Sequence, residues 1–196
     1  MFRRFTAPKG KVLFQPGQEC PGFLLLSKGT IRVTLTGASG REVVLYRVTP
    51  GDVCLQTFSC LVTDQPYGAE GVAETDLDGE LVPAEQFRTR MADDGAFRAR
   101  VMDAVARRFV EYQQLVDDIA LTGFDARLAK ALLRLADVDG KVHATHTALA
   151  AETASGRAYV SRRLAEFARQ GMVRQDEDGV ALLDRPGLQR IAADAR

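Results

Sequence analysis

Two cysteines in the segment CLQTFSC, residues 54–60, have the chemistry of a reactive or metal-binding site. A pair of thiols can bind a soft metal, form a disulfide or pack as two small apolar groups. The segment contains no histidine, lysine or arginine, the residues that could lower the thiol pKa. With Cys20 the chain has three cysteines, and an odd number argues against a disulfide framework. Cys54, Cys60 and Cys20 are therefore candidates for a redox or effector site, with buried thiols as the alternative.

The other residues with metal or catalytic chemistry are sparse. The two histidines, His143 and His146, are too few for the several histidines and the carboxylate of a cupin-type metal site. Three cysteines fall short of the four thiolates of an iron–sulfur cluster, and haem would need cysteine or methionine as the axial ligand in the first half. There is no Ser-His-Asp arrangement and no phosphate-binding glycine loop. We therefore expect no metal, no cofactor and no enzyme, with a β-roll enzyme as a distant alternative.

Composition narrows the class of partner. The chain has 196 residues, 46% of them hydrophobic, which is enough for one large domain or two modest ones. Its formal net charge is zero, so a charged partner must be bound by a local patch. The sequence contains no signal peptide and no apolar run of about 18 residues, the length of a membrane span. We expect a cytoplasmic protein that has reduced thiols and does not contact a membrane.

Residues 1–92 have the pattern of a β domain. From Lys11 to Phe87, short runs of β-branched and aliphatic residues alternate with glycine. The runs IRVTL and VVLYRV flank residues 37–40, GASG, where glycine allows the positive φ of a tight turn. We expect these runs to form an antiparallel hairpin within a β-roll or jelly roll.

A long helix is predicted over residues 93–121. Between Gly95 and Ala120 there is neither proline nor internal glycine, and Gly123 ends the pattern. The apolar residues recur at spacings of three and four, which is typical of a helix that packs along a partner helix. They are Met102, Val105, Phe109, Tyr112, Val116 and Ile119. This stripe predicts a homodimer interface; the alternative is that it packs on its own β domain.

Residues 122–196 are predicted to form a third unit. Within it, residues 145–173 have the pattern of two helices joined by a tight turn, and Thr145 can cap the first of them. In the second helix the apolar residues share one face. The opposite, outer face is mainly polar and basic near the amino-terminal end of the helix. The outer residues are Arg157, Ala158, Ser161 and Arg162. A recognition helix meets the edges of bases with this end.

A short hairpin is predicted after these helices, because MVRQ and VALL flank DEDG. It matches the wing of a winged helix-turn-helix. Basic residues exceed acidic ones here, as DNA phosphates require. They are Lys141, Arg157, Arg162, Arg163, Arg169 and Arg174, against Glu152 and Glu166.

The chain resembles the cyclic-AMP receptor/fumarate-nitrate regulator (Crp/Fnr) family of bacterial transcription factors over nearly its entire length. The string T-H-x-x-L-A, six further residues, then R-x-x-V-S-R-x-L, at Thr145–Leu164, is similar to the family's DNA-binding pattern. The resemblance implies an α+β architecture: a jelly-roll sensor like a cyclic-nucleotide-binding domain, a dimerisation helix and a winged helix-turn-helix. It also implies a homodimer on an inverted-repeat operator in double-stranded DNA, with RNA polymerase as a partner.

The same resemblance assigns roles within the DNA-binding unit. Arg157 or Arg162 would bind guanine through both forks of the guanidinium. Many family members have a glutamate where this chain has Ala158, which leaves Ser161 or Tyr159 to contribute to base reading. The candidates for phosphate contacts are Arg163, Thr145 and His146. Two recognition helices in a dimer require half-sites about one helical turn apart, roughly 34 Å.

The effector is a separate question. The family's cyclic-nucleotide binders hold the ligand with a Gly-Glu segment and an arginine. Residues 48–87 contain no lysine or arginine, and Tyr67 stands where the phosphate-binding arginine is expected. Because a buried anion without a cation is costly, we expect independence from cyclic AMP. The segment CLQTFSC replaces the effector loop, which favours a thiol, redox or sulfur signal. The alternatives are a small-molecule effector, no effector, or, distantly, a signalling adaptor that does not bind DNA.

Overall fold

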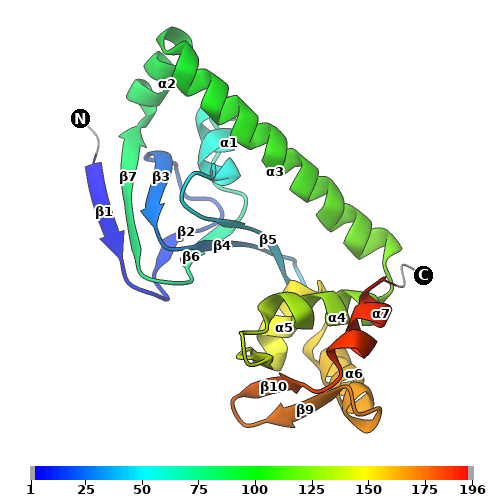
Figure 1. Ribbon diagram of the computed structural model, residues 1–196. Coiled ribbons are helices and arrows are strands. Elements are labelled where there is room, and N and C mark those ends of the chain that lie inside the picture. Colours follow the sequence, from blue (N-terminus) through cyan, green and yellow to red (C-terminus); the bar gives the residue numbers. More distant parts are fainter. Residues whose placement is uncertain (1–2, 194–196) are drawn as a thin grey trace. The chain divides into compact units, whose positions relative to one another are not determined.

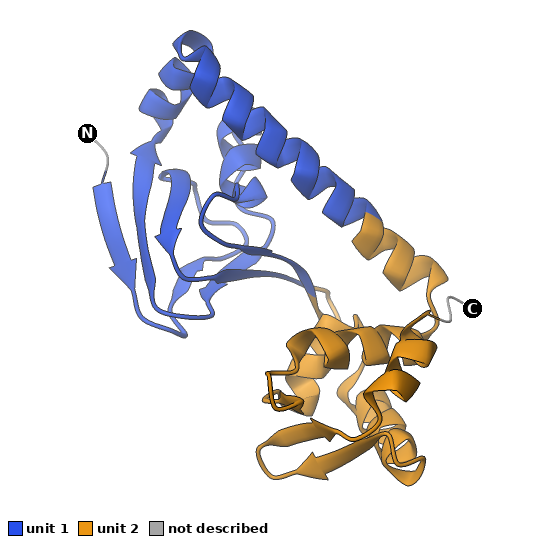
Figure 2. Ribbon diagram, viewed as in Figure 1, with its two compact units in different colours: residues 1–35, 44–113 blue, residues 36–43, 114–196 orange. Residues whose placement is uncertain are grey.

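The computed structural model of the chain describes residues 3–193 (Figure 1). It contains two compact units. One comprises the residues up to Leu35 and Val44–Gln113, and the other comprises Thr36–Val43 and the residues from Gln114 onward (Figure 2). Each unit has its own apolar core. No helix among the described residues is both long and apolar enough to cross a bilayer.

A β-roll forms most of the first unit. Its two sheets have the strand orders β1-β7-β3 and β2-β6-β4-β5. The strands are β1 (Arg3–Ala7), β2 (Val12–Phe14), β3 (Gly22–Lys28), β4 (Ile31–Thr36), β5 (Glu42–Val48), β6 (Glu70–Ala73) and β7 (Leu77–Pro83). Alternate residues of these strands are buried between the sheets, among them Ile31 and Val33. The predicted β-roll is confirmed.

The hairpin expected around GASG is also present. β4 and β5 are neighbours in their sheet. The Gly37 amide donates to the Arg41 carbonyl over 2.8 Å, which closes the turn. Gly40 has a φ of +75°, which favours glycine.

Three elements of the first unit were not expected: β1, the helix α1 (Leu55–Thr63) and the helix α2 (Ala84–Asp93), which begins where strand runs were predicted to continue to Phe87. Strand β1 lies before the region in which strands were predicted, and it pairs antiparallel with β7. The segment CLQTFSC is mostly helical: α1 spans Leu55–Thr63. The Thr57 hydroxyl donates to the Cys54 carbonyl over 2.9 Å at the start of this helix. The segment that the resemblance places at the family's effector loop is therefore a short helix in this chain.

Helices α2 (Ala84–Asp93) and α3 (Gly95–Leu121) follow the roll. Asp94 accepts a hydrogen bond from the Phe97 amide over 2.9 Å, which caps the first turn of α3. The Phe23 ring centroid lies 4.6 Å from that of Phe87 and 6.3 Å from that of Phe97, so β3, α2 and α3 share one aromatic core. The long helix is confirmed, and it ends before Gly123.

The second unit is a helical bundle with a small sheet. Its elements are α4 (Phe124–Leu135), β8 (Lys141–Val142), α5 (His146–Glu152), α6 (Arg157–Arg169), β9 (Val173–Asp176), β10 (Gly179–Leu182) and α7 (Arg185–Ala193). The sheet has the order β8-β10-β9, and β9 and β10 form the hairpin expected at DEDG. The winged helix-turn-helix is confirmed.

Candidate nucleic-acid interface and effector loop

The turn between α5 and α6 is held by side chains. Thr145 caps α5, accepting a hydrogen bond from the Ala148 amide over 3.1 Å, as predicted. The buried hydroxyls of Thr153 and Ser155 lie 3.0 Å apart. Between them Ala154 has a φ of +49°. This left-handed conformation is unfavourable for any residue that has a side chain. These contacts fix the direction in which α6 leaves the turn.

Helix α6 has one buried and one exposed face. Val160, Leu164 and Phe167 are buried in the core of the unit. On the opposite face Arg157 and Arg162 are exposed. Neither arginine forms an ion pair with an acidic side chain within residues 3–193. Two cations near the amino-terminal end of α6 are therefore available for an external anion.

Most other basic residues in the unit are already paired. Arg163, expected to contact phosphate, forms an ion pair with Asp125 of α4. The other basic residues singled out above pair as Arg169 with Glu166, Arg174 with Asp176, and Lys141 with Asp178. The unit also contains the pairs Lys130–Asp118, Arg134–Glu152 and Arg190–Asp184. The basic excess seen in the sequence thus reduces, in the folded unit, to a few unpaired groups, of which Arg157 and Arg162 are two.

Two further sequence candidates bind each other. His146 Nδ1 lies 2.7 Å from Ser161 Oγ, which itself donates to the Arg157 carbonyl over 3.0 Å. This contact links α5 to α6. Both side chains therefore help to hold the recognition helix against its neighbour.

Tyr159 lies between an arginine and another ring. It is 43% exposed, its ring centroid is 4.4 Å from that of Phe124, and the Arg162 guanidinium carbon lies 5.6 Å from the ring centre. The aromatic face attracts the guanidinium and limits its orientations. Phe124 was not among the candidates from sequence, because it follows Gly123 far from the recognition helix along the chain.

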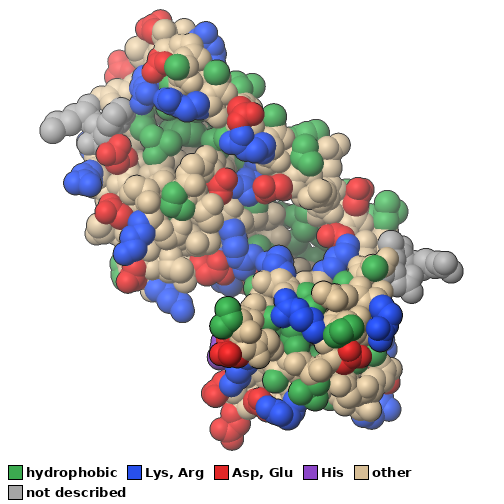
Figure 3. Space-filling model, in the orientation of Figure 1, with side chains coloured by type: hydrophobic (Ala, Val, Ile, Leu, Met, Phe, Trp, Pro, Cys, Tyr) green, Lys and Arg blue, Asp and Glu red, His purple; other side chains and the backbone are tan. Residues whose placement is uncertain are grey.

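The stripe on α3 divides between two faces. Val105 and Tyr112 are only partly exposed and pack against the cores of the first unit. Met102, Phe109, Val116 and Ile119 are exposed, at 49%, 61%, 60% and 37%. Apolar side chains are visible at the surface along the helix (Figure 3). Adding the exposed Ala106, Gln113 and Ala120 gives a seam that keeps the three–four spacing.

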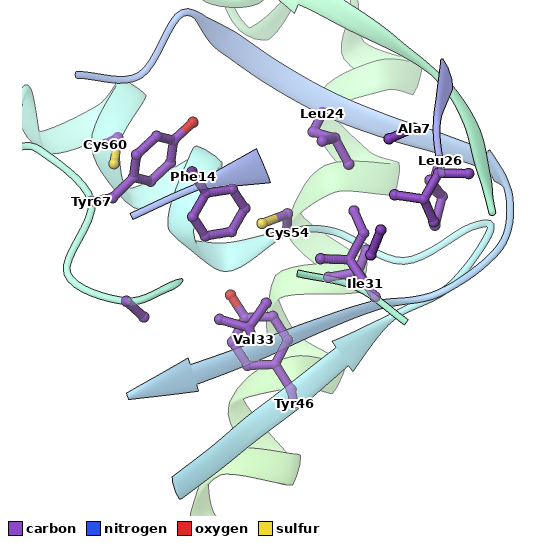
Figure 4. Packing of buried hydrophobic residues seen from close by; sticks show 14 residues of the cluster. Ala7, Phe14, Leu24, Leu26, Ile31, Val33, Tyr46, Cys54, Cys60 and Tyr67 are labelled. Atoms are coloured by element: carbon purple, nitrogen blue, oxygen red, sulfur yellow. The ribbon is translucent and has the colours of Figure 1, made fainter. Parts of the chain in front are cut away.

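The position expected for a phosphate-binding arginine is filled by an internal ring. Tyr67 is buried, and its ring centroid lies 4.5 Å from that of Phe14 (Figure 4). Its hydroxyl donates to Cys20 Sγ over 3.2 Å. Burial is the main cause that raises the pKa of Tyr67, so the hydroxyl stays neutral.

Gln56 closes the effector loop on itself. Its side-chain oxygen accepts a hydrogen bond from the Gly68 backbone amide over 3.0 Å. The backbone amide of Gln56 donates to the Tyr46 hydroxyl over 3.1 Å. Gln56 was not a candidate from sequence, because Gly68 and Tyr46 are distant from it along the chain.

Arg108 is the cation that sequence reasoning missed. Its side chain is 6% exposed, and it lies 3.1 Å from an Asp52 carboxylate oxygen, next to Glu111. Its guanidinium carbon is 5.1 Å from the centre of the Tyr46 ring. Burial opposes ionisation of Asp52, but hydrogen bonds from Thr49 and the charge of Arg108 outweigh it and lower the Asp52 pKa. Arg108 is thus neutralised within the first unit.

The three thiols do not converge on one point. Cys54 is fully buried, and burial raises its pKa. Burial and then contact with Cys20 raise the pKa of Cys60 to about 11. Figure 4 shows Cys54 and Cys60 at different places around the Phe14 and Tyr67 rings. Helix α1 directs Cys60 toward Cys20 and away from Cys54. Within residues 3–193 no group of three or more His, Cys, Asp or Glu side chains could hold a metal.

Two family models match the chain. A cyclic nucleotide-binding domain matches residues 4–94, and a Crp-like helix-turn-helix domain matches residues 126–191. Together they cover the β-roll and the helices around the candidate DNA-binding face.

Relatives and solved structures agree with these models. Transcriptional regulator LdrP of Thermus thermophilus is 30% identical, with 98% of this chain and 97% of that protein covered. The CRP-like cAMP-activated global transcriptional regulator of Mycobacterium tuberculosis is 24% identical, with 94% and 86% covered. A Crp/Fnr-family structure from Eubacterium rectale is 27% identical, with a TM-score of 0.88 and 97% and 89% covered. The chain therefore belongs to the Crp/Fnr family of DNA-binding transcription regulators.

Proposed function

We propose that the chain acts as a homodimer on an inverted-repeat operator, with α6 of each subunit in the major groove. The observation that carries this proposal is the exposed, unpaired state of Arg157 and Arg162 among the described residues. A guanidinium can donate two hydrogen bonds to guanine O6 and N7. The binding partners of the dimer are then DNA and RNA polymerase, and the chain itself catalyses no reaction.

The exposed seam of α3 supports the dimer. Apolar side chains such as Phe109 and Val116 are more than half exposed. A second copy of the same helix would bury them with the three–four spacing that coiled-coil packing requires. Two copies related by a twofold axis would present two α6 helices to DNA.

We also propose that cyclic AMP is not required, although the names of some relatives include it. Residues 48–87 provide no cation, and the Tyr67 ring is packed on Phe14. The Gly68 amide, which could donate a hydrogen bond to a phosphate, already donates to the Gln56 side chain. Arg108 is engaged with two carboxylates. A cyclic phosphate would therefore bury its charge without a free partner.

Binding of a fluorescent random-sequence duplex tests the DNA-binding part of this proposal. If six to ten phosphates are contacted, affinity should fall roughly a thousandfold or more between 50 and 200 mM salt. Titration of cyclic AMP into the same protein should give no heat and no change in affinity. Absence of salt-dependent retention would favour an adaptor, and a cyclic-AMP response would overturn the independence from cyclic nucleotide.

A response to thiol oxidation is a second candidate function, because Cys20 and Cys60 line one cleft of about 490 Å³ and Cys20 contributes to the raised pKa of Cys60. A peroxide would convert the Cys20 thiol, which is partly exposed, to a sulfenic acid with release of water. Attack by the Cys60 thiol would then form a disulfide and release a second water. Mass mapping after treatment with hydrogen peroxide should find a Cys20–Cys60 disulfide; overoxidised or unmodified thiols would exclude this response.

A further inference from the structure

A cavity of about 690 Å³ lies within the first unit and has no role in the function above. One wall is the inner face of the sheet β1-β7-β3. Leu81 of β7 is opposite Arg3 of β1 on one side and Leu24 of β3 on the other, so the three side chains form a row on the same face. Phe5 lies next to this row, over Gly79.

The facing wall is also largely apolar. Leu13 and Phe14 of β2 line it, together with Tyr67, whose ring is stacked on Phe14. Thr57 of α1 lines one side of the cavity. Its hydroxyl already donates a hydrogen bond to the Cys54 carbonyl. The cavity therefore has apolar walls, and its volume falls in the range of about 300–1,000 Å³ typical of small-molecule sites.

Charge is concentrated at the rim. Arg3 and Arg4 line the cavity, and neither forms an ion pair with an acidic side chain within residues 3–193. The acidic side chain in the lining is Glu19, and Glu80 lies opposite Arg4 on β7. Arg3 shares the row of Leu81 and Leu24, so its guanidinium is the cation adjacent to the apolar walls.

We propose that this cavity binds an apolar carboxylic acid such as a medium-chain fatty acid. The hydrocarbon chain lies between the Leu24–Leu81 row and the Phe14–Tyr67 rings, and the carboxylate binds Arg3. Burial of the chain removes apolar surface from water, and the guanidinium matches a carboxylate in charge and shape. Because Thr57 of α1 and Tyr67, in the segment that follows α1, both line the cavity, an occupant would contact the CLQTFSC segment from inside the roll.

Calorimetric titration with octanoate and with octanol, each below its micelle or solubility limit, separates the two parts of the proposal. Octanoate is expected to bind about tenfold more tightly than octanol, because only the acid pairs with arginine. Arg3→Gln should remove this difference and leave octanol binding unchanged. Arg41→Gln, at an exposed arginine outside the cavity, is the matched control and should change nothing.

Leu81→Trp should fill the cavity and abolish binding of both probes. Val62→Trp, at an exposed position on α1, introduces the same side chain outside the cavity and should bind like the wild type. If Leu81→Trp does not fold, as judged by circular dichroism, Leu13→Trp at a partly buried position on the facing wall fills the same space. Equal affinity for the two probes, binding that survives the filled cavity, or no binding at all would overturn the proposal. The assay contains no DNA, so its failure leaves the regulator assignment unaffected.

Discussion

Arg108 of the long helix α3 and Asp52, in the loop before α1, form an ion pair with 3.1 Å between nitrogen and oxygen. The arginine is almost fully buried, while the aspartate is one-third exposed. The pair joins the effector loop to α3 within the first unit. A change in the loop that displaces Asp52 would leave the buried Arg108 guanidinium paired with Glu111 alone, which is costly.

Replacing Arg108 by methionine should therefore destabilise the protein. We expect a loss of about 2 kcal/mol in the free energy of unfolding, because Asp52 and Glu111 both lose a charged hydrogen-bond donor. Urea unfolding followed by circular dichroism measures this loss.

Arg107→Met is the matched control for Arg108→Met. Arg107 precedes Arg108 and forms an exposed ion pair with Asp103 on the same helix. An exposed pair contributes about 1 kcal/mol at most. Similar losses for the two variants would contradict the role given to the buried pair.

Arg162 depends on Tyr159 for its orientation. Replacing Arg162 by alanine should weaken binding to a selected operator by about 1–3 kcal/mol and relax the preference at one base pair. Tyr159→Leu should have a smaller effect in the same direction, because it removes the aromatic face 5.6 Å from the guanidinium carbon. Fluorescence anisotropy with matched and single-mismatch duplexes measures both.

Arg169→Ala is the control for these variants. It lies at the other end of α6 and is paired with Glu166. The base preference of this variant should match that of the wild type. If Arg169→Ala relaxes the preference as much as Arg162→Ala, the amino-terminal end of α6 is not the reading surface.

Phe109→Asp should convert the dimer to a monomer. The side chain is 61% exposed in the single chain, so the substitution does not disturb the core, but it places a charge in the centre of the proposed helix seam. Sedimentation equilibrium measures the mass. Val62→Asp, equally exposed on α1, should remain dimeric. A dimer that persists in Phe109→Asp would move the interface elsewhere.

Cys60 should react slowly at neutral pH. Burial and the neighbouring Cys20 raise its pKa to about 11, so the neutral thiol is favoured and the thiolate fraction rises only as pH approaches that value. At pH 8, alkylation by iodoacetamide should be roughly a hundredfold slower than for a thiol of pKa 9.

Cys20→Ser should accelerate Cys60 alkylation at pH 8, because it removes one cause of the raised pKa. Peptide mass mapping gives the rate at each cysteine, and Cys54, which is fully buried, serves as the internal unreactive control. A Cys60 rate that is already maximal at pH 8 would contradict the raised pKa.

The elements that could be predicted from sequence are those encoded locally. The α5–turn–α6 unit combines a cap at Thr145 with an apolar face of regular spacing, and both features recur in the structure. Strand β1 was missed because RRFTA has a basic, weakly alternating sequence and is stabilised by pairing with β7. Helix α1 has no side-chain cap, and its position depends on packing within the roll.

Contacts between distant residues could not be predicted. The spacing on α3 identified a helix with apolar stripes but not which stripe covers the roll, so Val105 and Tyr112 were grouped with residues that are exposed. Likewise, the approach of Cys60 to Cys20 and of Arg108 to Asp52 depends on how α1 and α3 pack. Periodicity gives the faces of an element, whereas the tertiary fold decides what each face meets.

Selection of duplexes from a random DNA library by the reduced protein, without cyclic nucleotide, would show whether the α6 helices of a dimer read an inverted repeat. We expect enrichment of an inverted repeat with half-sites about one helical turn apart, and loss of that enrichment when Arg157→Ala and Arg162→Ala are combined in one variant. Enrichment of no sequence, of single half-sites only, or of a repeat that appears only after cyclic AMP is added would contradict this expectation.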